Sequence, residues 1–489
     1  MLFNSLEFAI YLPIIFILYW FVFNKNLKWQ NGLIVIASYV FYGWWDWRFL
    51  SLIIVSSIID YCIGLALAST SIEKKRKLLL YSSIGVNLSF LGVFKYFNFF
   101  SENFSKAFIF LGMHVSDFTL DIILPVGISF YTFQTMSYTI DIYKNKLEPT
   151  KDIFSFFAFV SFFPQLVAGP IERAKNLLPQ FYSKRKFENN LASDGLYQIL
   201  WGLFKKVAIA DQCAIVVNTV FDNYHSYDSF SLIGAAILFA FQIYCDFSGY
   251  SDIAIGTSKL FGFNLMKNFA YPYFSRDIAE FWRRWHISLS SWFRDYVYIP
   301  LGGSRVETGK KIKNIFIIFI ISGFWHGANW TYVFWGALNA VYFLPSLLKG
   351  TNRKNLQVIS NTQKLPSLGD FSRIIKTFFL TVIAWVFFRS ATLAGAFDFL
   401  RRTVTNEGTV NYYESLSNHN LLQFLFTTVL IAVLIIYEWL SRSKDFVKVD
   451  VLFGDRVKQA LTLLIVTIFI LIILIQTRNE SVDFIYFQF

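Results

Sequence analysis

One apolar run decides the fold of this chain. Residues 314–347 have the sequence NIFIIFIISGFWHGANWTYVFWGALNAVYFLPSL. Basic residues lie on both sides of the run, at Lys311 and Lys313 before it and at Lys349 and Arg353 after it. Because Lys and Arg mark the cytoplasmic side of a membrane protein, both ends of the run are expected on that side. The sequence therefore predicts a hairpin of two short membrane helices.

The middle of this hairpin carries an imidazole. His326 lies about 13 residues, or roughly 20 Å of helix, after Lys313, close to the mid-depth of a hydrocarbon core roughly 30 Å thick. An ionisable side chain at that depth is a functional candidate, and the first helix is expected to end near it. The alternative is a buried structural histidine that is hydrogen bonded to Ser322 or Asn329.

Small and aromatic neighbours favour the functional interpretation of this histidine. Gly323 and Gly327 flank the ring at a spacing that lets another backbone approach closely. Trp325 and Trp330 can form the walls of a cavity. The hairpin is therefore expected to hold a site and not only a span.

The composition is typical of a multi-pass membrane protein. Of the 489 residues, 55% are hydrophobic, 20% are aromatic and 16% are charged, whereas a soluble chain carries about 25% charged residues. The net charge of +12 suggests a nucleic-acid partner, but the Lys and Arg residues fall in short clusters between apolar runs, as in cytoplasmic loops. The sequence therefore predicts an all-α integral membrane protein that binds no nucleic acid.

The apolar runs and their flanking charges predict ten to twelve membrane helices in one integral domain over residues 1–489. The basic cluster Lys74–Lys77 marks the cytoplasmic side, and both chain ends are expected outside. Residues 153–168 are apolar but have basic residues on both sides, so a re-entrant segment is expected there. Besides the hairpin, the expected helices are 6–23, 31–45, 49–69, 78–100, 122–143, 191–220, 230–250, 374–390, 421–440 and 459–476.

The largest piece between spans, residues 263–312, is expected on the cytoplasmic side. It contains FWRRWHISLSSWFRD at residues 281–295, and Asp277 precedes Glu280 by three residues, as at a capped helix start. On one continuous helix, five apolar side chains would share a stripe and lie in the membrane interface. These side chains are Trp282, Trp285, Leu289, Trp292 and Phe293. For His286, an anchoring role and a role in a site both stay open.

Several common chemistries lack their motifs in this chain. There is no nucleophile elbow, zinc-binding His-Glu-x-x-His helix, phosphate loop or dinucleotide fingerprint. Cys62, Cys213 and Cys245 are scattered and show no metal-ligand spacing, so no metal site is expected.

The remaining groups suit acid–base group transfer. The imidazole of His326 can take the proton of an attacking hydroxyl, and Asn329 can hydrogen-bond the developing oxyanion. Asp246 and Asp252, in CDFSGYSD at residues 245–252, are further candidates. The alternative for the two aspartates is that they cap a helix break or pair with an arginine.

These motifs closely resemble the membrane-bound O-acyltransferase (MBOAT) superfamily. The resemblance lies in WHGANW at 325–330, FWRRWHISLS at 281–290 and DYVYIPLGG at 295–303. It extends to the branch that O-acetylates exported polysaccharides such as alginate and peptidoglycan, through FPQLVAGP at 163–170, GLFKK at 202–206, residues 241–249 and the tail FIYFQF at 484–489. The resemblance covers nearly the whole chain.

The resemblance implies a mechanism and its residues. His326 matches the family's catalytic histidine, and His286 matches a histidine that lies with it along a tunnel through a ring of helices. From the residues themselves, and not from the resemblance, Trp325, Asn329 and Asp246 are the expected supporting, oxyanion or tunnel residues. The implied acyl donor is acetyl-CoA or another cytoplasmic acyl thioester, and no bound cofactor is expected.

The resemblance also implies partners and a location. The acceptor would be a separate SGNH-type acetyltransferase, or another acceptor on the outer face, which then modifies an exported polysaccharide. The chain would lie among lipids in the cytoplasmic (inner) membrane of a bacterium. Two other interpretations remain, namely D-alanyl transfer to teichoic acid and a polysaccharide-precursor transporter or flippase in which His326 relays protons.

Overall fold

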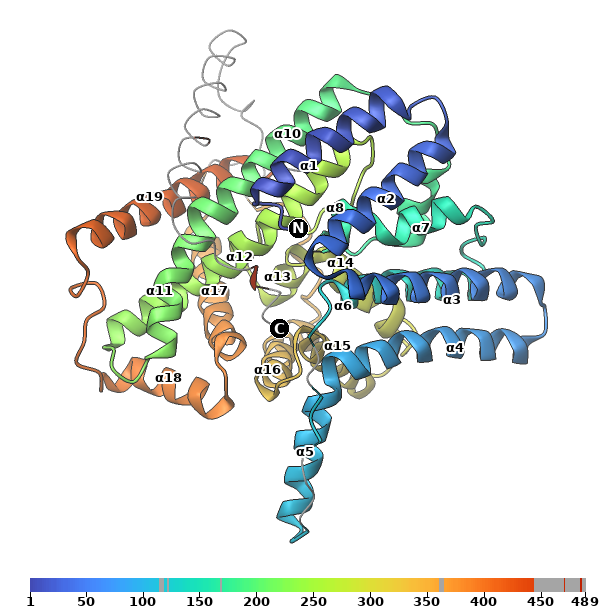
Figure 1. Ribbon diagram of the computed structural model, residues 1–489. Coiled ribbons are helices and arrows are strands. Elements are labelled where there is room, and N and C mark those ends of the chain that lie inside the picture. Colours follow the sequence, from blue (N-terminus) through green and yellow to red (C-terminus); the bar gives the residue numbers. More distant parts are fainter. Residues whose placement is uncertain are drawn as a thin grey trace. The chain divides into compact units, whose positions relative to one another are not determined.

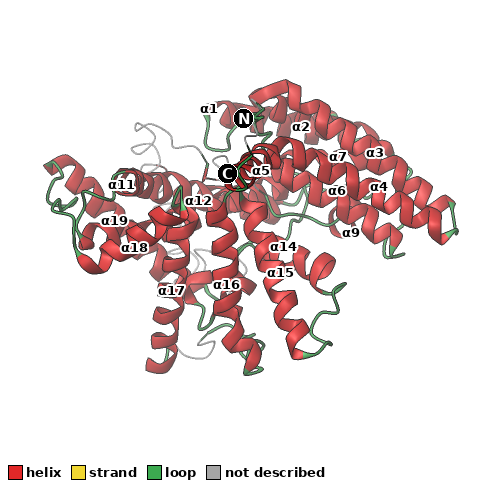
Figure 2. Cartoon of the chain, turned by 90° about the horizontal axis from the view of Figure 1, so that it is seen from below, coloured by secondary structure: helices red, strands yellow, loops and turns green. Residues whose placement is uncertain are grey.

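The described part of the chain is helical. The computed structural model describes residues 1–113, 118–120, 123–167, 169–359, 365–443, 470 and 484–485, and these residues form no β-strand beyond one isolated bridge between Tyr227 and Val410 (Figures 1 and 2). The predicted all-α class is therefore confirmed. The expected helix at 459–476 and most of the tail motif lie outside the described residues.

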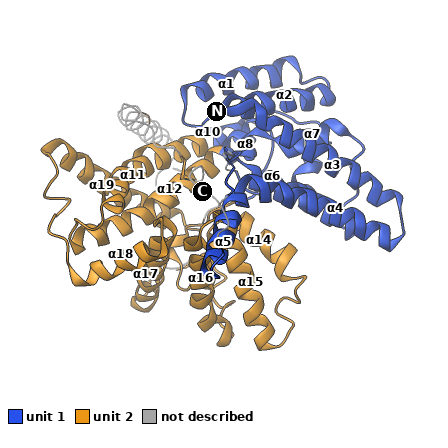
Figure 3. Cartoon of the chain, turned by 60° about the horizontal axis from the view of Figure 1, so that its bottom comes forward, with its two compact units in different colours: residues 1–196, 254–266 blue, residues 197–253, 267–489 orange. Residues whose placement is uncertain are grey.

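The chain falls into two compact units (Figure 3). The first comprises Met1–Leu196 and Ala254–Met266, and the second comprises Tyr197–Ile253 and Lys267–Phe489. The long helices α10 (Asn189–Leu203) and α12 (Ser229–Leu260) each contribute residues to both units. Whether the chain is one integral domain, as expected from the sequence, stays a prediction.

Pairs of packed helices make up the first unit. In it α3 packs against α4 and α6, and α2 packs against α7. A polar cluster lies in this core, where the buried carboxylate of Asp60 accepts hydrogen bonds from Ser83 and Asn87. The helices are α1 (Leu6–Ile17), α2 (Leu27–Asp46), α3 (Leu50–Ser69), α4 (Glu73–Leu91), α5 (Phe97–Phe110), α6 (Ile128–Tyr143), α7 (Ile153–Ser161), α8 (Phe163–Leu166) and α9 (Ala174–Leu177).

The second unit holds the hairpin predicted from the opening run. Helices α15, α16 and α17 lie side by side (Figure 2), and α13 packs against α16. The helices are α11 (Asp211–Asp222), α13 (Ile278–Arg284), α14 (Ile287–Phe293), α15 (Thr308–His326), α16 (Trp330–Leu348), α17 (Leu368–Arg389), α18 (Leu393–Thr405) and α19 (Asn418–Ser441). The helix expected at 191–220 is interrupted by a π-helical segment, Phe204–Ala210, which lies between α10 and α11.

Six helical stretches of the described chain are long and apolar enough to cross a membrane. They are Leu27–Ser69, Glu73–Phe110, Ser229–Leu260, Trp330–Leu348, Leu368–Arg389 and Asn418–Ser441. Leu27–Ser69 contains both α2 and α3, so it includes two of the expected spans. The predicted multi-pass architecture is confirmed, and the total of ten to twelve helices, the orientation and the re-entrant segment at 153–168 stay predictions.

The prediction of one continuous interfacial helix within residues 281–295 is wrong. The chain forms two short helices, α13 and α14, with a break at Trp285 and His286. Asp277 does cap α13, because its side chain accepts a hydrogen bond from the Glu280 amide. Trp285 and Trp292 are 1% and 3% exposed, so both pack inside the protein and do not anchor a helix in the membrane interface. A stripe of aromatic residues marks an apolar surface, but it does not say whether lipid or protein covers it.

Candidate functional site

The predicted hairpin places His326 at a helix end. Helix α15 ends at His326 and α16 begins at Trp330, as expected from the sequence. Asn329 caps α16, since its side-chain oxygen accepts a hydrogen bond from the Thr331 amide at 3.0 Å. Its amide nitrogen donates to the carbonyl oxygen of Ala391 at 3.0 Å. The structure thus gives Asn329 a role in holding the hairpin, and a role with an oxyanion stays a prediction.

Glycines bring the two helices of the hairpin into backbone contact. A Cβ added at Gly323 of α15 would lie 2.1 Å from the carbonyl oxygen of Tyr332. A Cβ added at Gly336 of α16 would lie 2.2 Å from the carbonyl oxygen of Phe319. Such contacts leave no room for any side chain, so the close approach expected at Gly323 is confirmed.

Three aromatic rings enclose the imidazole of His326, which is 3% exposed. The centroid of the imidazole lies 4.9 Å from that of Trp325, 5.2 Å from that of Trp335 and 5.3 Å from that of Phe388. These rings come from α15, α16 and α17 and stand at steep angles to the imidazole, between 74° and 88°. We refer to Trp325, Trp335 and Phe388 as the aromatic cage.

The second histidine lies at the break between α13 and α14. His286 has the left-handed backbone conformation, with φ of +42°, and is 1% exposed. Its Nδ1 atom lies 3.0 Å from the side-chain oxygen of Asn268 and 3.4 Å from the Ser288 hydroxyl. The Asn268 oxygen also accepts hydrogen bonds from the Ser288 hydroxyl and amide. We refer to Asn268 and Ser288 as the polar niche of His286.

The two histidines share one tryptophan. The Trp325 ring, already part of the aromatic cage, lies 5.9 Å from the His286 ring between centroids. The distance between the centroids of the two imidazoles therefore cannot exceed the sum of their centroid distances to this indole, which are 4.9 Å and 5.9 Å. Both lie in the second unit, so the structure brings together His326, His286 and Trp325 as the sequence predicts.

Burial keeps His286 neutral. The residue lies outside the six candidate membrane spans. Its complete enclosure lowers its pKa from 6.5 to about 3, because the charged imidazolium loses its hydration. At neutral pH this ring can therefore exchange hydrogen bonds but does not carry a charge.

Within the described part of the chain, the two aspartates of α12 form ion pairs with lysines. Lys206 lies 2.8 Å from both Asp246 and Asp211, and Lys205 pairs with Asp252. Both lysines belong to the π-helical segment Phe204–Ala210, where a wider turn often marks a polar or functional position. The structure therefore favours the pairing alternative for these carboxylates.

Asp246 makes one further contact that bears on the site. Its second oxygen accepts a hydrogen bond from the Ile485 amide at 2.7 Å, and the Phe484 ring lies 6.2 Å from the Phe247 ring. Phe247 in turn contacts His286 at 4.6 Å between centroids. Asp246 thus holds two tail residues beside a ring that packs on His286, and its supporting role in the site stays a prediction.

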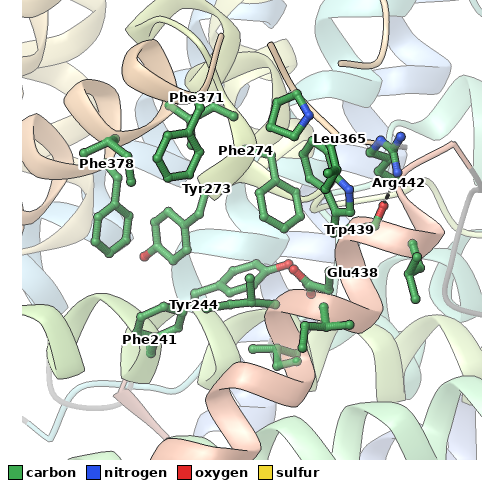
Figure 4. A pocket seen from close by; sticks show the side chains of 17 residues that line it. Phe241, Tyr244, Tyr273, Phe274, Leu365, Phe371, Phe378, Glu438, Trp439 and Arg442 are labelled. Atoms are coloured by element: carbon green, nitrogen blue, oxygen red, sulfur yellow. Dashed lines mark hydrogen bonds between the residues drawn. The ribbon is translucent and has the colours of Figure 1, made fainter. Parts of the chain in front are cut away.

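A large apolar pocket lies in the second unit, with a volume of about 1030 Å³ (Figure 4). Among the residues that line it, the Tyr244 hydroxyl donates to the buried carboxylate of Glu438 at 2.7 Å, and the Arg442 guanidinium donates to the Trp439 carbonyl oxygen at 2.6 Å. The rings of Tyr244 and Tyr273 each lie about 6 Å from Trp285, which packs on Trp385. None of the three cage rings lines this pocket. Trp385 contacts both Trp285 and the cage residue Trp335, so ring contacts connect the pocket wall with the cage.

Among the described residues, no three His, Cys, Asp or Glu side chains gather where they could hold a metal ion. A cage of rings around one imidazole and hydrogen bonds around the other suit proton transfer and substrate positioning, respectively.

Comparison with known proteins decides the family. The family model described as "MBOAT, membrane-bound O-acyltransferase family" matches residues 39–389, a range that includes both histidines. The chain belongs to the MBOAT family. It is therefore a multi-pass membrane acyltransferase, and this activity replaces the transporter considered from the sequence.

Named proteins differ in how much of this chain they resemble. A protein of Pseudomonas syringae pv. tomato named "Probable alginate O-acetylase AlgI" is 40% identical over 397 residues, covering 80% of this chain and 73% of the relative. The peptidoglycan O-acetyltransferase of Helicobacter pylori is 35% identical over 437 residues, covering 83% and 80%. The teichoic acid D-alanyltransferase of Bacillus subtilis is 28% identical over 230 residues, covering 44% and 57%. This MBOAT protein is thus similar to the O-acetylating relatives over far more of its length.

Sequence reasoning missed several residues of the MBOAT site. Trp335 and Phe388 complete the cage from helices that follow His326 in the chain, and Asn268 reaches His286 across 18 residues. The apolar faces of α16 and α17 carry too many aromatic residues for spacing to single out two of them. No pattern in the sequence joins Asn268 to His286, because their contact depends on a left-handed turn.

Proposed function

We propose that this chain transfers an acetyl group from a cytoplasmic thioester across the membrane for O-acetylation of an exported or cell-wall polysaccharide. The observation that carries the proposal is the meeting of His326 and His286 at Trp325, within a chain that is similar to polysaccharide O-acetylating relatives over four fifths of its length. The membrane is proposed to be the bacterial inner membrane, where a cytoplasmic donor and an exported acceptor lie on opposite faces.

In this reaction His326 is the proposed catalytic base. The acceptor hydroxyl attacks the carbonyl carbon of the thioester while the imidazole takes the hydroxyl proton. The carbon–sulfur bond then breaks, and the thiolate leaves with the proton that the imidazolium returns. The aromatic cage supports this role, because it shields the imidazole from water.

The donor and acceptor follow from the same scheme. Acetyl-CoA or another cytoplasmic acyl thioester is the proposed donor, and no bound cofactor is needed. The proposed acceptor is an outer-face protein of the SGNH acetyltransferase type, which passes the group to the glycan. Similarity to the alginate and peptidoglycan relatives supports a polysaccharide as the final product.

The test is the replacement of His326 by Gln. Glutamine keeps hydrogen bonding but cannot take a proton near neutral pH, so transfer should fall by a factor of about 10² to 10⁴. The measurement is glycan ester content per unit of folded, detergent-extracted protein. His419→Gln is the matched control, since that histidine is exposed at the start of α19 and should keep wild-type transfer.

Two outcomes would overturn the proposal. If His326→Gln kept more than about a tenth of wild-type transfer, the general-base role would be lost. If radiolabel moved from a D-alanyl carrier and not from an acetyl thioester, the acyl group would be a D-alanyl group and the product would differ. His286→Gln should retain more activity than His326→Gln, because His286 is proposed to contact the donor and not to move the proton.

A further inference from the structure

The side chain of Asn268 determines which nitrogen of His286 carries the proton. Asn268 is fully buried in the segment after α12. Its backbone oxygen accepts a hydrogen bond from the Ile287 amide at 2.8 Å, and its side-chain nitrogen donates to the Ser251 hydroxyl at 3.0 Å. The residue thus fixes the break between α13 and α14 from both its backbone and its side chain.

The orientation of the Asn268 amide follows from its partners. The Ser288 backbone N–H lies 3.3 Å from the atom assigned as the Asn268 oxygen. A backbone N–H can only donate, so the atom that faces it must be an acceptor. A flipped amide would place two N–H donors against each other. The oxygen therefore faces Ser288 and His286, and the nitrogen faces Ser251.

The proton on His286 follows in turn. An amide oxygen has no hydrogen to give, so Nδ1 must donate across the 3.0 Å that separates it from Asn268. The Ser288 hydroxyl, which lies 3.4 Å from Nδ1, already donates to the same oxygen at 2.9 Å. It is therefore not the donor to a lone pair on Nδ1. The neutral ring carries its proton on Nδ1 and its lone pair on Nε2.

We propose that Asn268 is a positioning residue for acyl transfer, which holds His286 as the Nδ1–H tautomer so that Nε2 accepts a hydrogen bond from an N–H or O–H group of the acyl donor. This inference rests on the proposed function, in which His286 contacts the donor. The left-handed backbone of His286 supports it, because a non-glycine residue adopts that conformation only where its surroundings hold it. The other tautomer would turn an N–H toward the acyl donor, and that N–H would repel an N–H or O–H group of the acyl donor.

The first experiment reads the tautomer directly. The protein contains five histidines, so ¹⁵N-histidine labelling in detergent gives a small set of ring signals, and His286→Gln identifies the one that belongs to His286. A protonated Nδ1 and an unprotonated Nε2 are expected near pH 7. A protonated Nε2, or a fully protonated ring, would overturn the proposal whether or not the chain transfers acetyl groups.

The second experiment links the tautomer to activity. Asn268→Asp keeps an acceptor at Nδ1 and should retain the Nδ1–H tautomer with transfer within about threefold of wild type. Asn268→Ala should mix the tautomers and lower transfer about ten- to a hundredfold. Asn314→Ala removes another buried asparagine of the same unit, one that donates to the Leu301 carbonyl, and should leave the His286 signal unchanged.

A double variant separates positioning from general damage. If Asn268 acts through His286, adding Asn268→Ala to His286→Ala should cause no further loss of transfer. A full additional loss would show that Asn268 serves only the fold and would overturn the proposal. If Asn268→Ala does not accumulate, the tautomer of His286 in the wild-type protein still tests the assignment. The activities of Asn268→Asp and His286→Ala then test its link to acyl transfer. If the tautomer is as stated but His286→Ala transfers normally, the proposed donor contact fails and not the tautomer assignment.

Discussion

His326 and His286 both contact the ring of Trp325, but their surroundings differ. His326 packs among the steeply inclined rings of the aromatic cage, whereas His286 is held by an amide oxygen at Nδ1 and carries a strongly lowered pKa. Ring faces tolerate a transient positive charge, but a fixed Nδ1–H donor in a closed niche favours one neutral form. Two identical side chains on one tryptophan are thus prepared for different tasks.

The largest expected effect comes from disturbing the hairpin that carries His326. In Gly323→Ala the new methyl group would lie 2.1 Å from the Tyr332 backbone oxygen, which cannot move without moving α16. A displacement of the imidazole by about 1 Å should lower acyl transfer about 10²-fold. Gly309→Ala, on the same helix but with open space around its Cβ, should keep wild-type transfer. Equal activity in the two variants would show that the backbone contact does not position His326.

A smaller effect is expected from the tryptophan that the two histidines share. Trp325→Leu keeps an apolar side chain but removes ring contacts to both imidazoles. Without these contacts both imidazoles should shift, by less than in a variant that moves α16, so transfer should fall about tenfold. Trp330→Leu, at an exposed position in the same motif, should change little. If combining Trp325→Leu with His286→Gln multiplied their separate losses, Trp325 would serve His326 alone.

The smallest effect concerns stability against acid. The pKa of His286 lies at about 3 in the folded protein and at 6.5 ordinarily, so below pH 6.5 the unfolded chain binds a proton that the folded protein does not. The stabilisation that comes from keeping His286 neutral is therefore fully present above pH 6.5. It is lost as the pH falls toward 3, by at most about 1.4 kcal/mol per pH unit. The Tm of detergent-solubilised protein between pH 6.5 and 4.5 should fall less steeply for His286→Gln than for wild type. Parallel slopes would contradict the closed niche.

The sequence could predict the hairpin because charge and length decide it. Lys313 and Lys349 bracket a run too long for one helix and sufficient for two, and Gly327 and Asn329 supply the break. The sequence could equally predict the cap at Asp277, since helix capping depends on the spacing of residues close together in the chain. These features rest on neighbours in the chain, so the residues alone were enough.

The rest depends on contacts between distant segments. The stripe through Trp285 and Trp292 has the spacing of an interfacial helix, yet protein covers both side chains. The left-handed turn at His286 replaces that helix by two, and it requires the hydrogen bonds of Asn268, which the sequence does not connect to it. Pairing of Asp246 with Lys206 likewise becomes visible only when α12 and the π-helical segment are side by side.

The backbone contact between α15 and α16 also bears on engineering of acyl-group scope. A Cβ at Gly323 or Gly336 would clash with a backbone carbonyl oxygen of the other helix, so the distance between the two helices of the hairpin is fixed. The side chains of Trp335 and Phe388 are adjustable, since a smaller ring or an aliphatic group there would enlarge the space beside His326 without separating the helices. A mutagenesis library for longer acyl groups should therefore vary these two positions and leave both glycines untouched.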